Sequence, residues 1–361
     1  MNDKMRSMEN FMETYTRLST GKTGAANAFN KLRCLFFIFL VISSVSTASI
    51  AAFVQNAAPK PINKPLPSIH EALAGISSKN IRSHLQNLEG VRNFSTHPDQ
   101  LKQAQTYIET TFSNLGYVIT QHSFISAGSA FQNVIATRLG TRYPERRVLV
   151  IAHFDTVATS PGADDNASGV AVMLDLAKRL QAYSFENTIQ FIAANQEEDN
   201  MAGSRALANF AKENAWQIKG VICLDQVGYA GDAVKQLAPA GLEKIVPAIG
   251  NFIAAIGNEA STELVGQFIA GIRQQQIPLP HAQLVVPGNG EQNPDTGRSD
   301  HSSFWDAGYP AILVTDTAVY RNPHSHTHSD EIDTLNIEFL VNVCRAVGEL
   351  VNAIAVSVEQ H

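Results

Sequence analysis

Short apolar runs alternate with amphipathic stretches along most of the chain, and this alternation predicts an α/β fold. Hydrophobic residues recur at helical spacing over residues 69–88, 100–115, 170–180, 204–213, 242–256, 261–275 and 337–356. Compact apolar runs predict strands over residues 118–124, 133–139, 148–152, 188–194, 221–224 and 311–314. Because strands and helices follow one another in turn, we expect a mixed, largely parallel central β-sheet with helices on both faces.

The first 54 residues follow a different pattern. Lys31 and Arg33 precede an almost uncharged apolar run at residues 34–54, which becomes richer in small residues towards its end. This order predicts a secretory signal peptide cleaved within residues 48–52. Because about 20 apolar residues can span a bilayer, a retained membrane anchor is the alternative, and an ordinary core helix is a third. We expect an exported protein, periplasmic or secreted, or one anchored with its catalytic domain outside the cytoplasm.

A proline-rich stretch separates this segment from the rest of the chain. Four prolines lie within residues 55–68, which disfavours a helix and predicts an extended linker. The remaining residues, 69–361, have the length of one large domain, and the chain as a whole is 44% hydrophobic and only 17% charged. We therefore expect a single folded domain there and exclude a disordered or fibrous protein.

Charge and cysteine content narrow the functional classes. The formal net charge is −6, and the first 54 residues hold more basic than acidic residues, so the predicted domain is more acidic still. An acidic domain without a basic cluster argues against a nucleic-acid partner. The only cysteines, Cys34, Cys223 and Cys344, supply neither a disulfide framework nor a thiolate zinc site.

Three predicted strands end in side chains that can bind a metal. His153 follows VLVIA, Glu197 and Glu198 follow TIQFIAANQ, and Asp225 follows GVICL. In open α/β sheets, ligands lie outside the carboxyl ends of the strands. We therefore expect these four side chains to converge on one crevice.

Further polar groups lie between and after these strands. Asp155 is placed to orient the His153 imidazole, and the PGADDNASG segment at residues 161–169 offers carboxylates before a predicted helix. Taken singly, these groups also fit a surface polar pair and a helix N-cap, just as Glu197 and Glu198 also fit a solvated acidic loop. In a polar loop, His324, His326 and His328 alternate, and one or more of them could bind zinc.

Taken together and in order, these motifs closely resemble the M28 family of zinc peptidases over about residues 88–335. The resemblance rests on His153-Phe154-Asp155, GADDNASG, Gln196-Glu197-Glu198, Gly203-Ser204, Leu224-Asp225, Ser299-Asp300-His301 and His326-Thr327. It implies a zinc-exopeptidase fold of the phosphorylase/hydrolase-like type with two zinc ions per chain. It also implies a peptide substrate, and most soluble members of that family are aminopeptidases.

The family pattern implies a role for each matching residue. His153 and Asp225 would hold one zinc ion, Glu198 and His326 the other, and Asp165 would bridge the two, with a cis peptide bond after it. Two further roles are implied next to the metals. Glu197 would be the general base that activates the water held by the metals and later protonates the leaving amine. Asp155 would be the partner of His153.

The last motif departs from the family pattern. The family commonly has Tyr-His-Thr-Pro, whereas this chain has Ser325-His326-Thr327-His328. His328 could therefore compete for metal, and the chain has no tyrosine directly before His326 to assist the transition state. The preference for particular substrate side chains depends on loops between Tyr229 and Arg298, where we expect an apolar pocket.

Several alternatives keep the same fold. A glutaminyl cyclase would use one zinc ion, and a carboxypeptidase-type relative would act at the other end of a peptide, but the pair His153 and Asp225 favours a second metal and hydrolysis. A non-catalytic binding module on this scaffold would have lost metal ligands that are all present here. The M20 peptidases also use His-x-Asp and Glu-Glu, but their bridging Asp lies much further from the first His than Asp165 does.

Overall fold

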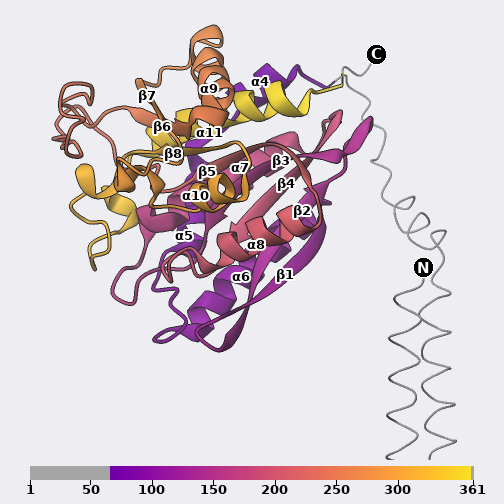
Figure 1. Cartoon of the computed structure of the whole chain (residues 1–361), viewed down its shortest axis with the longest axis horizontal. Coiled ribbons are helices and arrows are strands. Elements are labelled where there is room, and N and C mark those ends of the chain that lie inside the picture. The colour runs from indigo at the N-terminus through magenta and orange to yellow at the C-terminus, as the bar shows by residue number, and fades with distance from the viewer. Residues whose placement is uncertain (1–65, 359–361) are drawn as a thin grey trace, which may run out of the picture. The chain divides into compact units, whose positions relative to one another are not determined.

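In the computed structural model, which describes residues 66–358, a twisted eight-stranded β-sheet forms the centre of the fold (Figure 1). The strands lie in the order β1 (Val118–Ser126), β2 (Ser129–Arg138), β4 (Asn187–Ala194), β3 (Tyr143–His153), β5 (Gln217–Leu224), β8 (Ala311–Thr315), β6 (Ile253–Asn258) and β7 (His281–Val286). The pairs β4–β3, β3–β5, β5–β8 and β6–β7 are parallel, and the others are antiparallel. This confirms the predicted mixed, largely parallel sheet.

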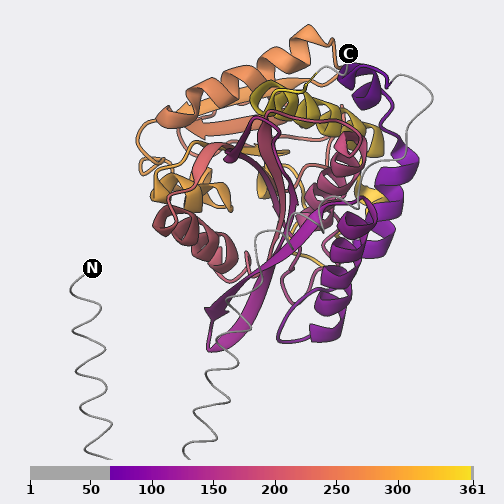
Figure 2. The same cartoon turned by 90° about the vertical axis from the view of Figure 1, so that its right-hand side faces the viewer.

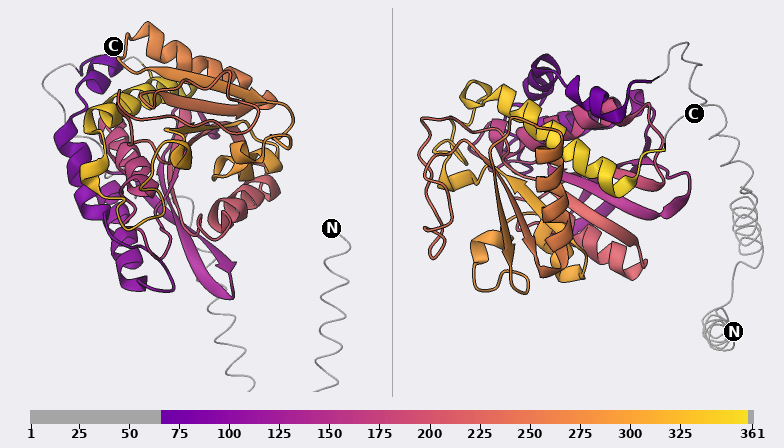
Figure 3. Two further views of the ribbon diagram at one scale, coloured as in Figure 1. Left: turned by 90° about the vertical axis from the view of Figure 1, so that its left-hand side faces the viewer. Right: turned by 90° about the horizontal axis from the view of Figure 1, so that it is seen from above.

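Helices cover both faces of the sheet (Figure 2). One face carries α5 (Ser78–Leu88), α6 (Pro98–Asn114), α7 (Gly169–Leu180), α9 (Thr262–Gln274) and α11 (Ile337–Ala355), and α4 (Ile69–Ala74) packs on α7 and α11. The other face carries α8 (Ala202–Glu213) and α10 (His301–Ala307). Figure 3 shows α9 and α11, which contact each other, lying side by side on their face.

The central strands are buried on both sides, which explains their continuous apolar sequences. In β3, Val148, Val150 and Ala152 pack in the larger apolar cluster with α7 and α11. Leu149 and Ile151 point to the opposite face, into the smaller cluster with α8 and α10. Successive side chains of a strand alternate between faces, so one run of five apolar residues fills both cores.

The parallel centre of the sheet determines where a site can form. Strands β4, β3, β5 and β8 are neighbours and run in the same direction, so their carboxyl ends lie along one edge. The segments that leave these ends therefore meet in one crevice.

Two sequence predictions about helices differ from the structure. The helix predicted at residues 242–256 is wrong: residues 242–252 form turns and bends, and Ile253–Asn258 is strand β6. Pro247 would lack a backbone donor in a helix interior, which explains why the apolar spacing does not produce one. β6 pairs with β7, a strand that the sequence pattern did not predict.

The predicted helix at residues 69–88 is divided into α4 and α5. Gly75 follows the last residue of α4, and the Ser77 hydroxyl accepts a hydrogen bond from the Asn80 N–H at the start of α5. An N-cap serine of this kind begins a new helix.

The predicted leader at residues 1–54 and most of the predicted linker lie outside the described residues. Within residues 66–358, no helix combines the length and hydrophobicity that crossing a bilayer requires.

Candidate metal centre

The predicted metal-binding side chains meet at the carboxyl edge of the sheet. His153 is the last residue of β3, Asp225 follows β5 directly, and Glu197 and Glu198 follow β4 after two residues. Asp165 lies in the irregular segment η1 (Ala163–Ser168) immediately before α7, and His326 lies in the loop after β8. The parallel strand order thus brings together residues that are far apart in the sequence.

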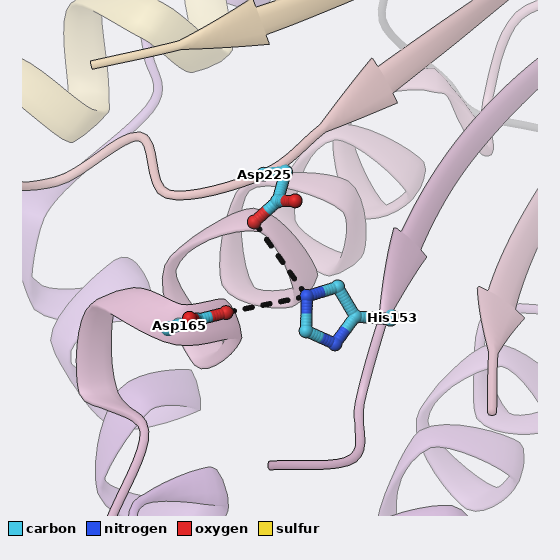
Figure 4. A group of neighbouring side chains, drawn as sticks. All are labelled: His153, Asp165 and Asp225. Atoms are coloured by element: carbon cyan, nitrogen blue, oxygen red, sulfur yellow. Dashed lines mark ion pairs between the residues drawn. The ribbon is translucent and has the colours of Figure 1, made fainter. Parts of the chain in front are cut away.

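His153, Asp165 and Asp225 form the first group (Figure 4). Nε2 of His153 lies 3.3 Å from Oδ1 of Asp165 and 3.5 Å from Oδ1 of Asp225. Both carboxylates point at the same ring nitrogen, which has no hydrogen-bond partner among the described residues although it is buried. Oδ1 of Asp225 is likewise buried without a hydrogen-bond partner in that part of the chain.

Asp165, Glu198 and His326 form the second group. Nε2 of His326 lies 3.0 Å from Oδ2 of Asp165 and 3.4 Å from Oε2 of Glu198. This group is more open than the first, because the His326 side chain is 47% exposed whereas that of His153 is 1% exposed.

Asp165 belongs to both groups and turns a different oxygen towards each. Its Oδ1 faces His153 and its Oδ2 faces His326. Imidazole and carboxylate donors, with no thiolate, are the ligand set of a catalytic zinc site. Since buried polar atoms are normally paired, the orphaned His153 and Asp225 atoms fit a cation between the ligands.

The Asp155 carboxylate connects two parts of the centre. Its Oδ1 lies 3.5 Å from Nδ1 of His153, although the Asp155 backbone carbonyl is nearer to that nitrogen, at 3.2 Å. Its two oxygens accept hydrogen bonds from the N–H groups of Glu197 (3.1 Å) and Glu198 (3.2 Å). Asp155 therefore contacts the backbone that presents both glutamates as well as the histidine ring.

Glu197 points towards the first group, with Oε2 3.9 Å from Nε2 of His153. Burial raises the pKa of Glu197 well above its ordinary value, and the carboxylates of Asp225 and Asp300 raise it further, although His153 opposes the shift. A carboxyl group with a raised pKa holds a proton more readily near neutral pH, as a general base must once it has accepted one.

The pKa values of Glu198, His326 and Asp165 are also shifted, because of burial and because these groups lie close to one another. Burial raises the pKa of Glu198 to about 8, with a further contribution from Asp165. The hydrogen bond to Asp165 raises the pKa of His326 to about 9. Burial would raise the pKa of Asp165, but its contacts with His153 and His326 outweigh burial and lower it. Bound cations would stabilise the ionised carboxylates in place of these protons.

The loop that carries Asp165 has an unusual backbone. The Asp165–Asn166 peptide bond is cis, as the family resemblance implies. Gly162 has a φ of 63°, and a Cβ there would clash with the Asp165 carbonyl oxygen. Only glycine therefore fits where the chain enters this loop.

Sequence reasoning missed several residues that contact this loop, among them Gln226 and Arg92. Gln226 donates a 3.0 Å hydrogen bond from Nε2 to Oδ2 of Asp165. Arg92 is buried, and its guanidinium donates to the carbonyl groups of Phe154 (2.7 Å) and Gly162 (2.9 Å). Gln226 is adjacent to Asp225 and could have been found there, whereas nothing in the local sequence marks Arg92.

Of the three alternating histidines, only His326 lies in a ligand group among the described residues. Nδ1 of His324 is 2.8 Å from Oγ of Ser329, and His328 is exposed. Ser325, which stands where the family commonly has tyrosine, is buried. In the Ser299-Asp300-His301 motif, Asp300 and His301 are buried at the start of α10.

A pocket of about 400 Å³ adjoins both ligand groups. Its polar end is formed by Asp165, Glu197, Glu198, Asp225 and His326. Its remaining wall is largely apolar and includes Leu242, Ile245, Val246, Phe252, Leu284 and Leu313. Residues 242–247 of this wall come from the loop between β5 and β6, within the region to which we assigned substrate preference.

Two known proteins are similar to this chain over more than two thirds of its length. YfbL of Escherichia coli K12, an uncharacterized protein, is 30% identical over 265 residues, covering 69% of this chain and 79% of that protein. Leucine aminopeptidase 1 of Trichophyton equinum is 26% identical over 313 residues, covering 80% of this chain and 77% of that protein.

Solved structures show the same fold. The LapA aminopeptidase of Legionella pneumophila has a TM-score of 0.64 at 20% identity, covering 84% of this chain and 80% of that chain. A glutaminyl cyclase from Macrostomum lignano has a TM-score of 0.61 at 17% identity, covering 81% and 94%. The fold is therefore common to hydrolases and cyclases.

The sequence profile of peptidase family M28 matches residues 133–351, which is more than half of the chain and includes every residue from His153 to His326 discussed above. This chain belongs to peptidase family M28 and is a metallopeptidase, a hydrolase of a zinc-dependent family.

Proposed function

We propose that this protein is an aminopeptidase that uses two zinc ions to remove the N-terminal residue of peptides. The observation that supports it best is the position of Asp165, whose two oxygens face His153 and His326 separately. His153 and Asp225 would hold one ion, Glu198 and His326 the other, and Asp165 both. Two zinc ions, when bound, polarise the scissile carbonyl and acidify water.

The residues around the metals supply the remaining steps. Glu197 accepts a proton from the attacking water and passes it to the leaving amine, which matches its raised pKa and its place beside the first group. Asp155 holds the backbone N–H groups of Glu197 and Glu198, so that the base and a ligand keep their relative positions. The acidic end of the pocket favours a positively charged amino terminus.

The apolar wall of the pocket supports a preference for large apolar N-terminal residues. A pocket of about 400 Å³ lined by leucine, isoleucine, valine and phenylalanine gains free energy by burying an apolar side chain. A peptide with a small or charged first residue would make fewer apolar contacts with this wall and would gain less binding free energy.

Glutaminyl cyclase activity is the alternative, because the fold is shared with such an enzyme. A glutaminyl cyclase would use one zinc ion. Two ligand groups that share the Asp165 carboxylate instead favour two ions and hydrolysis. We also propose export, from the apolar run at residues 34–54.

The test is hydrolysis of a panel of aminoacyl amides, each with a free and an N-acetylated amino group. We expect cleavage of the free-amine substrates alone, fastest for leucine and phenylalanine, with loss of activity on chelation and recovery with zinc. Equal cleavage of acetylated substrates would overturn the aminopeptidase assignment. Cyclisation of N-terminal glutamine without amide hydrolysis would support the cyclase instead.

A further inference from the structure

Asp330 is a buried acidic residue that none of the steps above uses. It lies four residues after His326, in the loop that follows β8, and its side chain has no exposure to solvent. A buried carboxylate is costly unless it is hydrogen-bonded or paired. The partners of Asp330 therefore indicate why it is there.

Those partners are consecutive backbone groups of the loop that carries Asp165. Oδ1 of Asp330 accepts a 2.9 Å hydrogen bond from the N–H of Asp164, and Oδ2 accepts a 3.1 Å hydrogen bond from the N–H of Asp165. The Asp330 carbonyl accepts a third, 3.0 Å bond from the N–H of Ala163. One residue thus binds three successive N–H groups.

These bonds constrain the backbone on which the shared carboxylate stands. Two successive N–H groups can reach one carboxylate only if both point the same way, and that fixes the peptide planes on either side of Asp164. The Asp165 carboxylate must place one oxygen towards His153 and the other towards His326, so a small rotation of its backbone would misplace both.

Asp330 also connects the two loops from which ligands come. Asp165 belongs to the loop before α7 and His326 to the loop after β8, and Asp330 is covalently part of the second while hydrogen-bonded to the first. Further bonds join the same segments, from Oγ1 of Thr159 to the His326 carbonyl at 3.3 Å and from Nδ2 of Asn322 to Oδ2 of Asp164 at 2.7 Å.

We propose that Asp330 is a positioning residue for the metal centre: its carboxylate holds the backbone of Asp165 in the orientation that lets this residue serve both ligand groups. Among the described residues, Asp330 belongs to neither ligand group and does not line the pocket. The inference rests on the proposed role of Asp165 as a metal ligand.

The test compares zinc binding by wild type, Asp330→Asn and Asp175→Asn, using zinc chloride in competition with a chromogenic chelator. Asp330→Asn keeps the side-chain size but replaces one acceptor oxygen with an NH₂ group that faces a backbone N–H. Asp175→Asn is the matched control. Like Asp330, Asp175 is a fully buried carboxylate, but it lies in α7, the helix that begins directly after the Asp165 loop.

We expect zinc affinity to fall by about 10- to 100-fold in Asp330→Asn, the usual effect of losing a group that supports a ligand, and to be unchanged in Asp175→Asn. Excess zinc should restore kcat in Asp330→Asn, with KM unchanged. A merely structural role would lower thermal stability without this recovery. If Asp330→Asn does not fold, Asp330→Glu, which keeps the charge but moves the carboxylate by one methylene, carries the same measurement.

Wild-type zinc affinity in the folded variant would overturn the role of Asp330, and so would an equal loss in Asp175→Asn. A wild-type protein that binds no zinc would instead overturn the proposed function itself, so the two failures are distinguishable.

Discussion

The two halves of the pocket are built in different ways. The strand-end half consists of His153, Asp165, Glu197, Glu198 and Asp225, whose side chains are between 1% and 13% exposed. The loop half is the segment at residues 229–251 together with residues 317–320, where the large apolar side chains of Ile245 and Val319 line the pocket and are at least half exposed (62% and 50%). Most candidate catalytic residues thus lie on buried elements, with His326 as the exposed exception, whereas part of the apolar wall lies on an exposed loop.

This difference has a physical basis. A buried charged group must keep its partners, so each side chain of the strand-end half is restrained by the packed element next to it, which is the start of α7 for Asp165 and a strand for the other four residues. A surface loop has few such restraints, and its residues can change without unfolding the core. Substitutions in the first half should therefore change catalysis, and those in the second should change preference among substrates.

The largest effect is expected for Glu197→Gln in the strand-end half. The amide cannot accept a proton, so kcat should fall by about 10²- to 10⁴-fold, the usual contribution of a general base. Zinc content should stay at the wild-type level, because Glu197 belongs to neither ligand group. Steady-state kinetics on leucine amide, together with elemental analysis, measure both quantities.

The matched control is Glu186→Gln. Glu186 immediately precedes β4, whereas Glu197 follows the other end of that strand. It should leave kcat unchanged. Full activity in Glu197→Gln would remove this residue from the role of base and would leave the strand-end half without an assigned proton acceptor.

A smaller and different effect is expected for Leu242→Ala in the loop half. Leu242 lines the pocket, and its loss removes apolar contact with a large substrate side chain. The ratio of kcat/KM for leucine amide to that for alanine amide should fall by about tenfold, since contacts of this size contribute about 1–3 kcal/mol.

Leu237→Ala is the control for this substitution, because Leu237 lies in the same loop but does not line the pocket. It should leave the ratio of kcat/KM values as in wild type. If Leu237→Ala reduced the ratio as much as Leu242→Ala, the loop would act through its overall conformation, and the apolar wall would not be the cause of the preference.

The same division explains what the sequence could predict. In the strand-end half, His153 follows VLVIA, Asp225 follows GVICL and Glu197 follows TIQFIAANQ, so the strand pattern and the acidic or imidazole side chain after it together predicted a shared crevice. The parallel order of β4, β3, β5 and β8 brings these residues together. The assignment of each as a ligand or base stays a prediction.

The loop half could not be predicted in the same way. Residues 242–256 have helical apolar spacing, yet Pro247 prevents a helix and the apolar residues line a pocket or enter β6. Periodicity reports which residues are apolar but not what covers them. Long-range contacts such as those of Arg92 and Asp330 leave no local pattern, because each partner lies tens of residues away or more.

The smallest effect concerns stability beneath the strand-end half. Asp175 is fully buried in α7, and burial raises its pKa above the ordinary value of 3.8, although Arg179 lies 3.8 Å away and opposes the shift. Because the pKa is higher in the folded state, the stabilising contribution of protonated Asp175 is present below about pH 4 and is lost as the pH rises through the folded-state pKa. At pH 7 the stability is therefore lower than it would be without this ionisable group.

Asp175→Asn removes the ionisable group and should raise the free energy of unfolding at pH 7 by about 1 kcal/mol, the usual size of a single-residue effect. The gain should shrink as the pH falls towards 4, because the wild-type carboxyl is then neutral too. Urea unfolding at pH 7 and pH 4 measures it, with the exposed Asp232→Asn of the loop half, expected within about 0.5 kcal/mol of wild type at both pH values, as control. A gain independent of pH would show that the effect comes from packing, and that charge burial beneath the strand-end half carries no cost in stability.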